Sequence, residues 1–312
     1  MFVTDKLIYL QMDKTACTHI ASLLSKHIGG QQIGLNYQKH NWLSDYETKK
    51  YICGSIRNPW EWYVSTWAFG CQGEGTIHNR VIIPDFQKFL EFFKHKLLSD
   101  YNPFSFNNVQ LGDTWLHFKN EIKKPVILWR DTYKDYQKPE KFRKWLKLIY
   151  DPERKRDFNE GYSESSVSNY AGLMTYLYCN FFIKNFFQTK NFRGLKTFEE
   201  LREFDKKNNI LNFTIKVESL ENDFIQMLEK FGYKIDVKTK NLILNSGRTN
   251  TSEHLKPSFY YDEETINLVA EKEKLIIEKY RYTPPEISSK TQNAGSGIRT
   301  RVIGLGSQYH NH

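Results

Sequence analysis

The alternation of apolar and polar positions near the start of the chain predicts a strand, a loop and a helix in that order. Leu7 to Leu10 is a short apolar run of the kind that forms a buried strand. Gln11 to Thr18 is predominantly polar and reads as a loop. Ile20 to His27 has helical spacing, and Gly29-Gly30 ends that helix.

A second unit of the same kind follows. Tyr51 to Ile56 reads as a strand, and Arg57-Asn58-Pro59 reads as a turn. Trp60 to Phe69 reads as a helix, with Pro59 near the first helical position, which suits its fixed φ. Two strand–turn–helix units in succession predict an α/β fold with a parallel β-sheet flanked by helices.

The same patterns extend this prediction along the rest of the chain. We expect a single domain over residues 1–283 and a flexible tail over 284–312, where Ser, Gly, Thr, Asn and Arg replace the apolar periodicity. Two further strands are expected at Pro125–Trp129 and Phe213–Val217. Further helices are expected at Phe86–Leu98, Pro139–Ile149, Leu173–Phe187, Leu220–Phe231 and Thr265–Tyr280.

Composition narrows the class of protein. The 312 residues carry 45 Lys and Arg against 36 Asp and Glu, a net charge of +9, which permits an anionic partner without identifying it. The densely basic run from Lys138 to Arg156 is interpreted as a solvated helix face followed by a basic loop, so a nucleic-acid partner is disfavoured. The four cysteines have no metal-ligand spacing and suggest reduced thiols. Without a recognisable leader or membrane span, we expect a cytoplasmic protein.

The first loop has the chemistry of an anion site. A loop that leaves a strand and enters a helix presents unpaired N–H groups and the positive end of the helix dipole. Lys14 adds a mobile charge, Thr15 and Thr18 add hydroxyl groups, and the small residues Ala16 and Cys17 allow a phosphate to approach. The glycines of an ATP-binding P-loop are missing, because the first glycine after Leu10 is Gly29.

The second loop offers a matching anion site. Arg57 stands at the end of the second strand, and Ser65 lies on the second turn of the helix that follows. A side chain on that turn can face back toward the strand end, so the guanidinium and the hydroxyl could meet on one phosphate. An ion pair between Arg57 and Glu61 is the alternative explanation of the arginine.

Together these loops resemble the sulfotransferases that use 3′-phosphoadenosine 5′-phosphosulfate (PAPS) as donor. Lys14-Thr15-x-x-Thr18 is similar to the family's 5′-phosphosulfate loop, and Arg57-Asn-Pro followed by Ser65 is similar to its 3′-phosphate motif. The resemblance spans about residues 5–283. It implies a P-loop-NTPase-like sulfotransferase fold, PAPS as donor and its desulfonated form PAP as product, with the cofactor-binding residues Lys14, Thr15, Ala16, Cys17, Thr18, His19, Arg57 and Ser65.

The chain departs from that family in the first loop. Asp13 stands where the family usually has proline, and Ala16 stands where it has glycine. Since alanine favours an ordinary negative φ, the backbone of this loop is expected to differ. The glycine-rich cofactor loop of cytosolic members is missing, and Arg248 in the corresponding region is a weaker candidate for the 3′-phosphate.

The resemblance also suggests catalytic residues. Lys14 would neutralise charge on the leaving oxygen, and no metal is required. His40 is assigned as the general base, because it lies between the first helix and the second strand, where the resembling enzymes place a histidine. His19 and Glu61 remain alternatives for the base. The acceptor would be a hydroxyl, or a nitrogen, of a small metabolite or a saccharide.

Two other functions remain open. A nucleotide or small-molecule kinase would also use a strand–loop–helix anion site, although the missing glycines count against it. A non-catalytic module that binds anions or nucleic acid through its basic surface is the second alternative. Tight binding of PAP without magnesium would exclude a kinase. Salt-sensitive binding of nucleic acid without PAPS turnover would favour the non-catalytic module.

Overall fold

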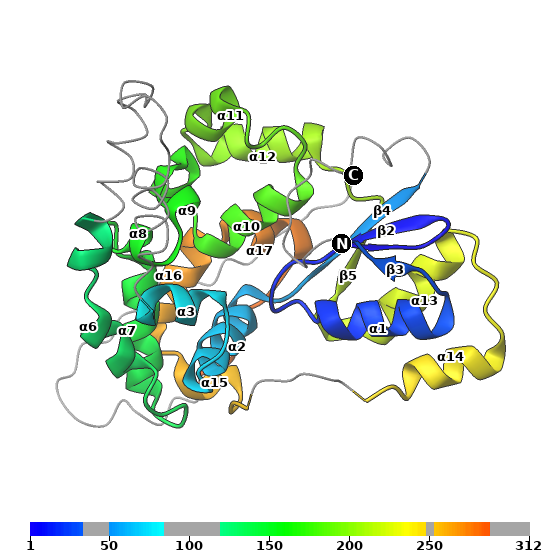
Figure 1. Cartoon of the computed structure of the whole chain (residues 1–312), viewed down its shortest axis with the longest axis horizontal. Coiled ribbons are helices and arrows are strands. Elements are labelled where there is room, and N and C mark those ends of the chain that lie inside the picture. Colours follow the sequence, from blue (N-terminus) through cyan, green and yellow to red (C-terminus); the bar gives the residue numbers. More distant parts are fainter. Residues whose placement is uncertain (34–49, 84–118, 248–252, 288–312) are drawn as a thin grey trace, which may run out of the picture.

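A computed structural model describes residues 1–33, 50–83, 119–247 and 253–287 (Figure 1). Three predictions lie outside the described residues: the helix Phe86–Leu98, the base His40 and the phosphate contact Arg248. Most of the predicted tail, from residue 288 onward, also lies outside them. The structure is an α/β fold with one five-stranded sheet and helices on both of its faces.

The sheet is mixed rather than wholly parallel, which corrects the prediction. Its order is β3-β1-β2-β4-β5, and β2, β4 and β5 run parallel while β1 pairs antiparallel with both β2 and β3. Only three residues separate β1 from β2, and so short a connection can join antiparallel neighbours but not parallel ones. The strands are β1 Phe2–Val3, β2 Leu7–Leu10, β3 Gln31–Gln32, β4 Tyr51–Ile56 and β5 Phe213–Lys216.

The parallel register brings the ends of β2 and β4 to one edge of the sheet. Leu10, the last residue of β2, lies opposite Gly54, and β4 ends two residues later at Ile56. The loops that leave these strands therefore lie side by side, as the two strand–turn–helix units predicted.

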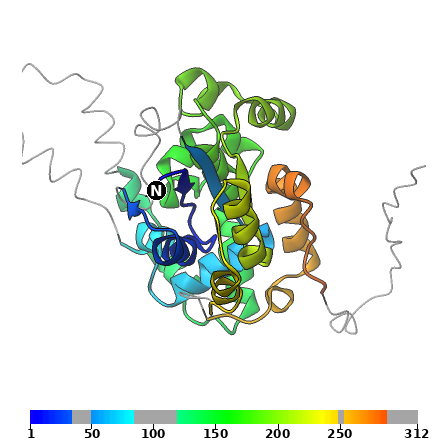
Figure 2. The same ribbon diagram turned by 90° about the vertical axis from the view of Figure 1, so that its right-hand side faces the viewer.

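Alternation along the strands separates the core into two clusters. Leu7, Tyr9, Cys53 and Ile215 belong to the cluster that includes α1 (Cys17–His27) and α13 (Leu220–Lys230) on one face. The intervening residues, such as Ile8 and Ile52, belong to a larger cluster. In Figure 2, α1 in dark blue and the C-terminal helices in orange lie on opposite sides of the molecule.

The larger cluster is rich in tryptophan and is built mainly from helices. Trp60, Trp62, Trp67, Trp129 and Trp145 are almost completely buried in it, and the first three of them lie on the helix after β4. The helices of the described chain, besides α1 and α13, are α2 Pro59–Cys71, α3 Thr76–Ile82, α6 Val126–Thr132, α7 Pro139–Tyr150, α8 Lys155–Phe158, α9 Glu160–Glu164, α10 Leu173–Phe182, α11 Thr189–Gly194, α12 Phe198–Asn208, α14 Val237–Leu244, α15 Pro257–Tyr260, α16 Glu263–Lys272 and α17 Lys274–Tyr280, with short 3₁₀ turns η2 Ser166–Asn169 and η3 Val217–Ser219.

Two predicted elements are wrong. The segment expected as the strand Pro125–Trp129 is the helix α6, in which Trp129 and Thr132 are buried while Ile127 is 83% exposed. That burial has a spacing of three rather than two, as a helix requires. The long helix expected over Thr265–Tyr280 is interrupted at Glu273, which separates α16 from α17.

The basic run Lys138–Arg156 includes a solvent-facing side of α7, as predicted. Lys141 and Lys144 on α7 pair with Asp131, at 2.8 and 3.2 Å, and Lys147 pairs with Glu264 at 2.7 Å. Such exposed pairs contribute little stability each, but they neutralise the local positive charge. Among the described residues, every helix is too short or too polar to cross a bilayer.

Candidate functional site

The loop between β2 and α1 has an unusual backbone. Lys14 and Ala16 both adopt the left-handed conformation, with φ of 59° and 60°. Ala16 is also the N-cap of α1, and its side chain has no acceptor for the N–H groups of the first turn. The expectation that alanine would take an ordinary φ here is therefore wrong, since the residue keeps the conformation that glycine favours.

Hydrogen bonds between hydroxyl groups connect this loop to the sheet. Thr15 is fully buried, and its Oγ1 donates to the carbonyl of Met12 at 2.7 Å. The same hydroxyl lies 2.7 Å from Oγ of Ser55 on β4, which in turn lies 2.7 Å from the hydroxyl of Tyr9 on β2. Thr15 thus links the loop to two adjacent strands, and its predicted contact with a phosphate stays a prediction.

Lys14 lies in a poorly hydrated position. Its Nζ is 3.7 Å from the centroid of the Phe69 ring on α2, a cation–π contact. Burial lowers the pKa of Lys14 to about 8, with the nearby positive charge of Arg57 acting in the same direction and the carboxylate of Asp13 opposing it. The two predicted cations, one from each loop, are therefore close enough for their charges to interact.

Arg57 is fixed at the start of α2. Its Nε and Nη2 both lie 3.4 Å from Glu61 Oε2, one turn along the helix, so the ion pair considered from the sequence is present. The neighbouring Asn58 caps α2 by accepting from Trp60 N at 3.1 Å, and Pro59 occupies the first helical position. A ligand anion would have to compete with Glu61 for the guanidinium.

The other predicted residues have different environments. Thr18 is exposed on the first turn of α1, next to the N–H groups of that turn, whereas Cys17 is buried in the core and burial raises the pKa of its thiol. His19 is buried and lies 3.4 Å from Ser246 Oγ. Ser65 is buried on α2. The structure thus leaves Thr18 accessible and encloses the other three.

One residue near the two cations was not selected from the sequence. His254 is half-buried, and its Nδ1 lies 2.8 Å from the carbonyl of Leu255. Burial lowers its pKa, the positive charges of Arg57 and Lys14 lower it further, and Glu61 opposes them. No local pattern marks this histidine, because the groups that surround it are about 200 residues away in the chain.

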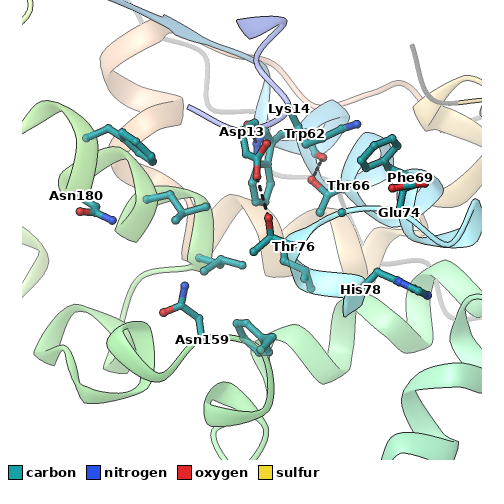
Figure 3. Close-up of a pocket in the computed structure, with 16 residues that line it drawn as sticks. Asp13, Lys14, Trp62, Thr66, Phe69, Glu74, Thr76, His78, Asn159 and Asn180 are labelled. Atoms are coloured by element: carbon teal, nitrogen blue, oxygen red, sulfur yellow. Dashed lines mark hydrogen bonds between the residues drawn. The ribbon is translucent and has the colours of Figure 1, made fainter. Parts of the chain in front are cut away.

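A cavity of about 260 Å³ opens beside the first loop and was also missed from the sequence (Figure 3). Aromatic and aliphatic side chains of α2, α8 and α10 form most of its wall: Trp62, Phe69, Phe158, Leu173, Leu177 and Phe181. Polar residues also line it, among them Asp13, Lys14, Thr76, His78, Asn159 and Asn180.

The cavity could not be read from the sequence because its walls come from separate parts of the chain. A signal was present in residues 158–190, a segment rich in Phe, Tyr, Asn and Ser that contributes Phe158, Leu177 and Phe181 to the wall. Among the described residues, no group of three or more potential ligands is arranged to hold a metal ion. Comparison with protein-family models, with curated proteins and with solved structures finds no match.

Proposed function

We propose that this protein transfers a sulfuryl group from PAPS to a hydroxyl or a nitrogen of a small acceptor and releases PAP. One observation carries the proposal: the parallel register of β2 and β4 brings the loops of Lys14 and Arg57 to the same edge of the sheet, where the charge of Arg57 also lowers the pKa of Lys14. Two cations held together in this way suit a ligand with two separate anionic groups.

The donor would lie across the two loops. Its 5′-phosphosulfate would bind the N-terminal turn of α1, whose N-cap side chain makes no capping hydrogen bond and where the exposed hydroxyl of Thr18 can donate to it. Its 3′-phosphate would bind the guanidinium of Arg57, drawing it from Glu61. The contributions predicted for Ser65 and Arg248 remain part of the proposal.

Lys14 would act on the leaving group. As the acceptor oxygen or nitrogen forms its bond to sulfur, the bond between sulfur and the bridging phosphate oxygen breaks and leaves negative charge on that oxygen. The poorly hydrated ammonium of Lys14 would neutralise this charge, and electrostatic stabilisation of that kind is strong where water is excluded.

The proposal is tested by calorimetric titration with PAP in magnesium-free buffer, with AMP as the analogue that lacks the 3′-phosphate. We expect PAP to bind more tightly than AMP, and Arg57→Ala to remove that preference, a loss of roughly 10- to 100-fold in PAP affinity. Arg202→Ala, at an exposed arginine of α12, is the matched control and should leave both affinities unchanged.

Other outcomes favour the other functions. Equal binding of PAP and AMP would remove the support for a 3′-phosphate site. Tight binding of ATP that requires magnesium would favour a kinase, and salt-sensitive binding of RNA or DNA without binding of PAP would favour a nucleic-acid module.

A further inference from the structure

The cavity and the first loop meet at Asp13. The carboxylate of this residue reaches the cavity from the loop side, and Lys14 lines the cavity next to it (Figure 3). Acceptor and leaving-group chemistry could therefore take place at one cavity, which both the carboxylate of Asp13 and the side chain of Lys14 line.

The main chain of Asp13 is anchored to α2, and its carboxylate lies at the limit of hydrogen-bond distance from Thr76 on α3. Its main-chain carbonyl accepts from Trp62 Nε1 at 2.8 Å, and its Oδ2 lies 3.5 Å from the hydroxyl of Thr76. The buried hydrogen bonds of Thr15 fix the loop two residues later. A carboxylate supported in this way is suited to a positioned role in proton transfer.

We propose that Asp13 is the proton acceptor of the transfer, and that the cavity binds a hydroxyl compound with a largely apolar body. This inference rests on the proposed sulfotransferase function and gives Asp13 the role that the sequence analysis assigned to His40. The acceptor hydroxyl gives its proton to the carboxylate as its oxygen forms the bond to sulfur. The sulfur–oxygen bond of PAPS breaks, and PAP keeps the electron pair beside Lys14.

The lining of the cavity sets the class of acceptor. The side chains of Leu173, Leu177 and Phe181 on α10 favour an aromatic or aliphatic skeleton over a saccharide, whose many hydroxyls would lose their hydration there. The carboxylates of Asp13 and Glu74 disfavour an anionic acceptor. A phenol or an alcohol with a single polar end matches both conditions.

The test uses ³⁵S-labelled PAPS with two acceptors, water and 4-propylphenol. We expect Asp13→Asn to bind PAP as the unaltered protein does, while the turnover of PAPS falls roughly 100-fold with either acceptor. The acid limb of the pH profile should disappear in this variant. Lys14, Glu74 and His78 are other titratable groups that line the cavity, so the control is a carboxylate outside it. Glu203→Gln, at an exposed residue of α12, should keep both the rate and the acid limb.

A second variant tests the cavity itself. Leu177→Trp places an indole where the apolar body would bind, and it should abolish transfer to 4-propylphenol without weakening the binding of PAP. His40→Ala is measured in parallel. Full turnover in Asp13→Asn, or loss of the acid limb in His40→Ala alone, would overturn the role of Asp13.

The remaining outcomes are also decisive. If the protein binds PAP but neither hydrolyses PAPS above the buffer rate nor sulfates 4-propylphenol, the inference about Asp13 and the acceptor is wrong. If it does not bind PAP, the proposed function itself fails, which is a separate result.

Discussion

The left-handed backbone at Ala16 lowers the stability of the folded protein locally, at the start of α1. An L-residue in this conformation is disfavoured by roughly 1–2 kcal/mol, because its Cβ crowds the following carbonyl group. The surrounding contacts maintain the conformation: Thr15 is tied to Met12 and Ser55, and Ala16 O accepts the N–H of Ile20 at 3.0 Å. Conformations of this kind concentrate at ligand sites.

We therefore expect Ala16→Gly to leave the free energy of unfolding unchanged or to raise it by up to about 1 kcal/mol, measured by urea denaturation. Glycine removes the steric cost at φ 60°, and this gain offsets the greater freedom of the unfolded chain. The same replacement inside α1, Ala21→Gly, should lower the free energy by about 1 kcal/mol. Equal losses in the two variants would contradict this account.

At the scale of elements, a buried carboxylate links the junction of α16 and α17 to α10 and α2. Glu273, between α16 and α17, accepts from the N–H groups of Met174 and Thr175 at 3.3 and 2.7 Å, in the first turn of α10. It also accepts from the hydroxyls of Thr175 and of Tyr63 on α2, at 2.6 and 2.5 Å. Glu273 thus acts as the N-terminal cap that Gly172 cannot provide and positions the helix that walls the cavity.

Gly172 is required for this arrangement. A Cβ at that position would lie 2.0 Å from Glu273 Oε1, which leaves room for glycine alone without a shift of the carboxylate. The break between α16 and α17 occurs where this carboxylate reaches α10. Helical periodicity runs through Glu273 without interruption, so the sequence predicted one helix.

Glu273 also predicts a dependence of stability on pH. Burial raises its pKa from 4.5 to about 7, against the lowering effect of its hydrogen bonds. The folded state holds the proton of Glu273 more tightly than the unfolded state does. The contribution of protonated Glu273 to the free energy of unfolding is therefore complete below about pH 4.5. It is lost as the pH rises through 7, up to about 3 kcal/mol in total.

The measurement is the free energy of unfolding of Glu273→Gln from pH 5 to pH 8. Relative to the unaltered protein, the variant should become more stable as the pH rises, because its amide does not ionise whereas the buried carboxylate does. The constant offset between the two curves includes the hydrogen bonds that an amide NH2 cannot accept. Glu278→Gln, at a half-exposed residue of α17, should follow the unaltered protein at every pH. Parallel pH curves for Glu273→Gln and the unaltered protein would contradict the raised pKa.

At the scale of the whole molecule, tertiary structure brings together positive charges from distant parts of the chain. Lys14, Arg57 and His254 come from two neighbouring strand ends and from the segment before α15. The charge of Arg57 lowers the pKa of both Lys14 and His254, and that of Lys14 lowers the pKa of His254. Bound phosphates would offset this repulsion and raise the pKa of Lys14 and His254. Binding of the donor should therefore be coupled to proton uptake.

We expect the affinity for PAP to be highest and independent of pH below about pH 8. Above that pH it should fall by up to tenfold per pH unit, because Lys14 loses its proton in the free protein. Calorimetry between pH 7.5 and 9.5 in two buffers of different ionisation enthalpy measures both affinity and proton uptake. In Lys14→Arg the guanidinium stays charged, so both effects should vanish. If the affinity for PAP does not change across this pH range, the coupling is refuted.

Local patterns were sufficient for the two strand–loop–helix units. The apolar run Leu7 to Leu10, the strand before Arg57 and Pro59 at the first helical position depend on residues close together in sequence, and the structure confirms them. The units also placed Lys14 and Arg57 at one edge of the sheet, because parallel strands end on the same side.

Long-range contacts decided the rest. The cavity beside Asp13, the position of His254 and the capping of α10 by Glu273 each depend on groups that lie far apart in the chain. The sequence by itself therefore determined the α/β class and the pair of cationic loops, since hydrophobic periodicity and turn chemistry are local. Tertiary structure alone decided what surrounds those loops, because burial and charge interactions depend on distance in space.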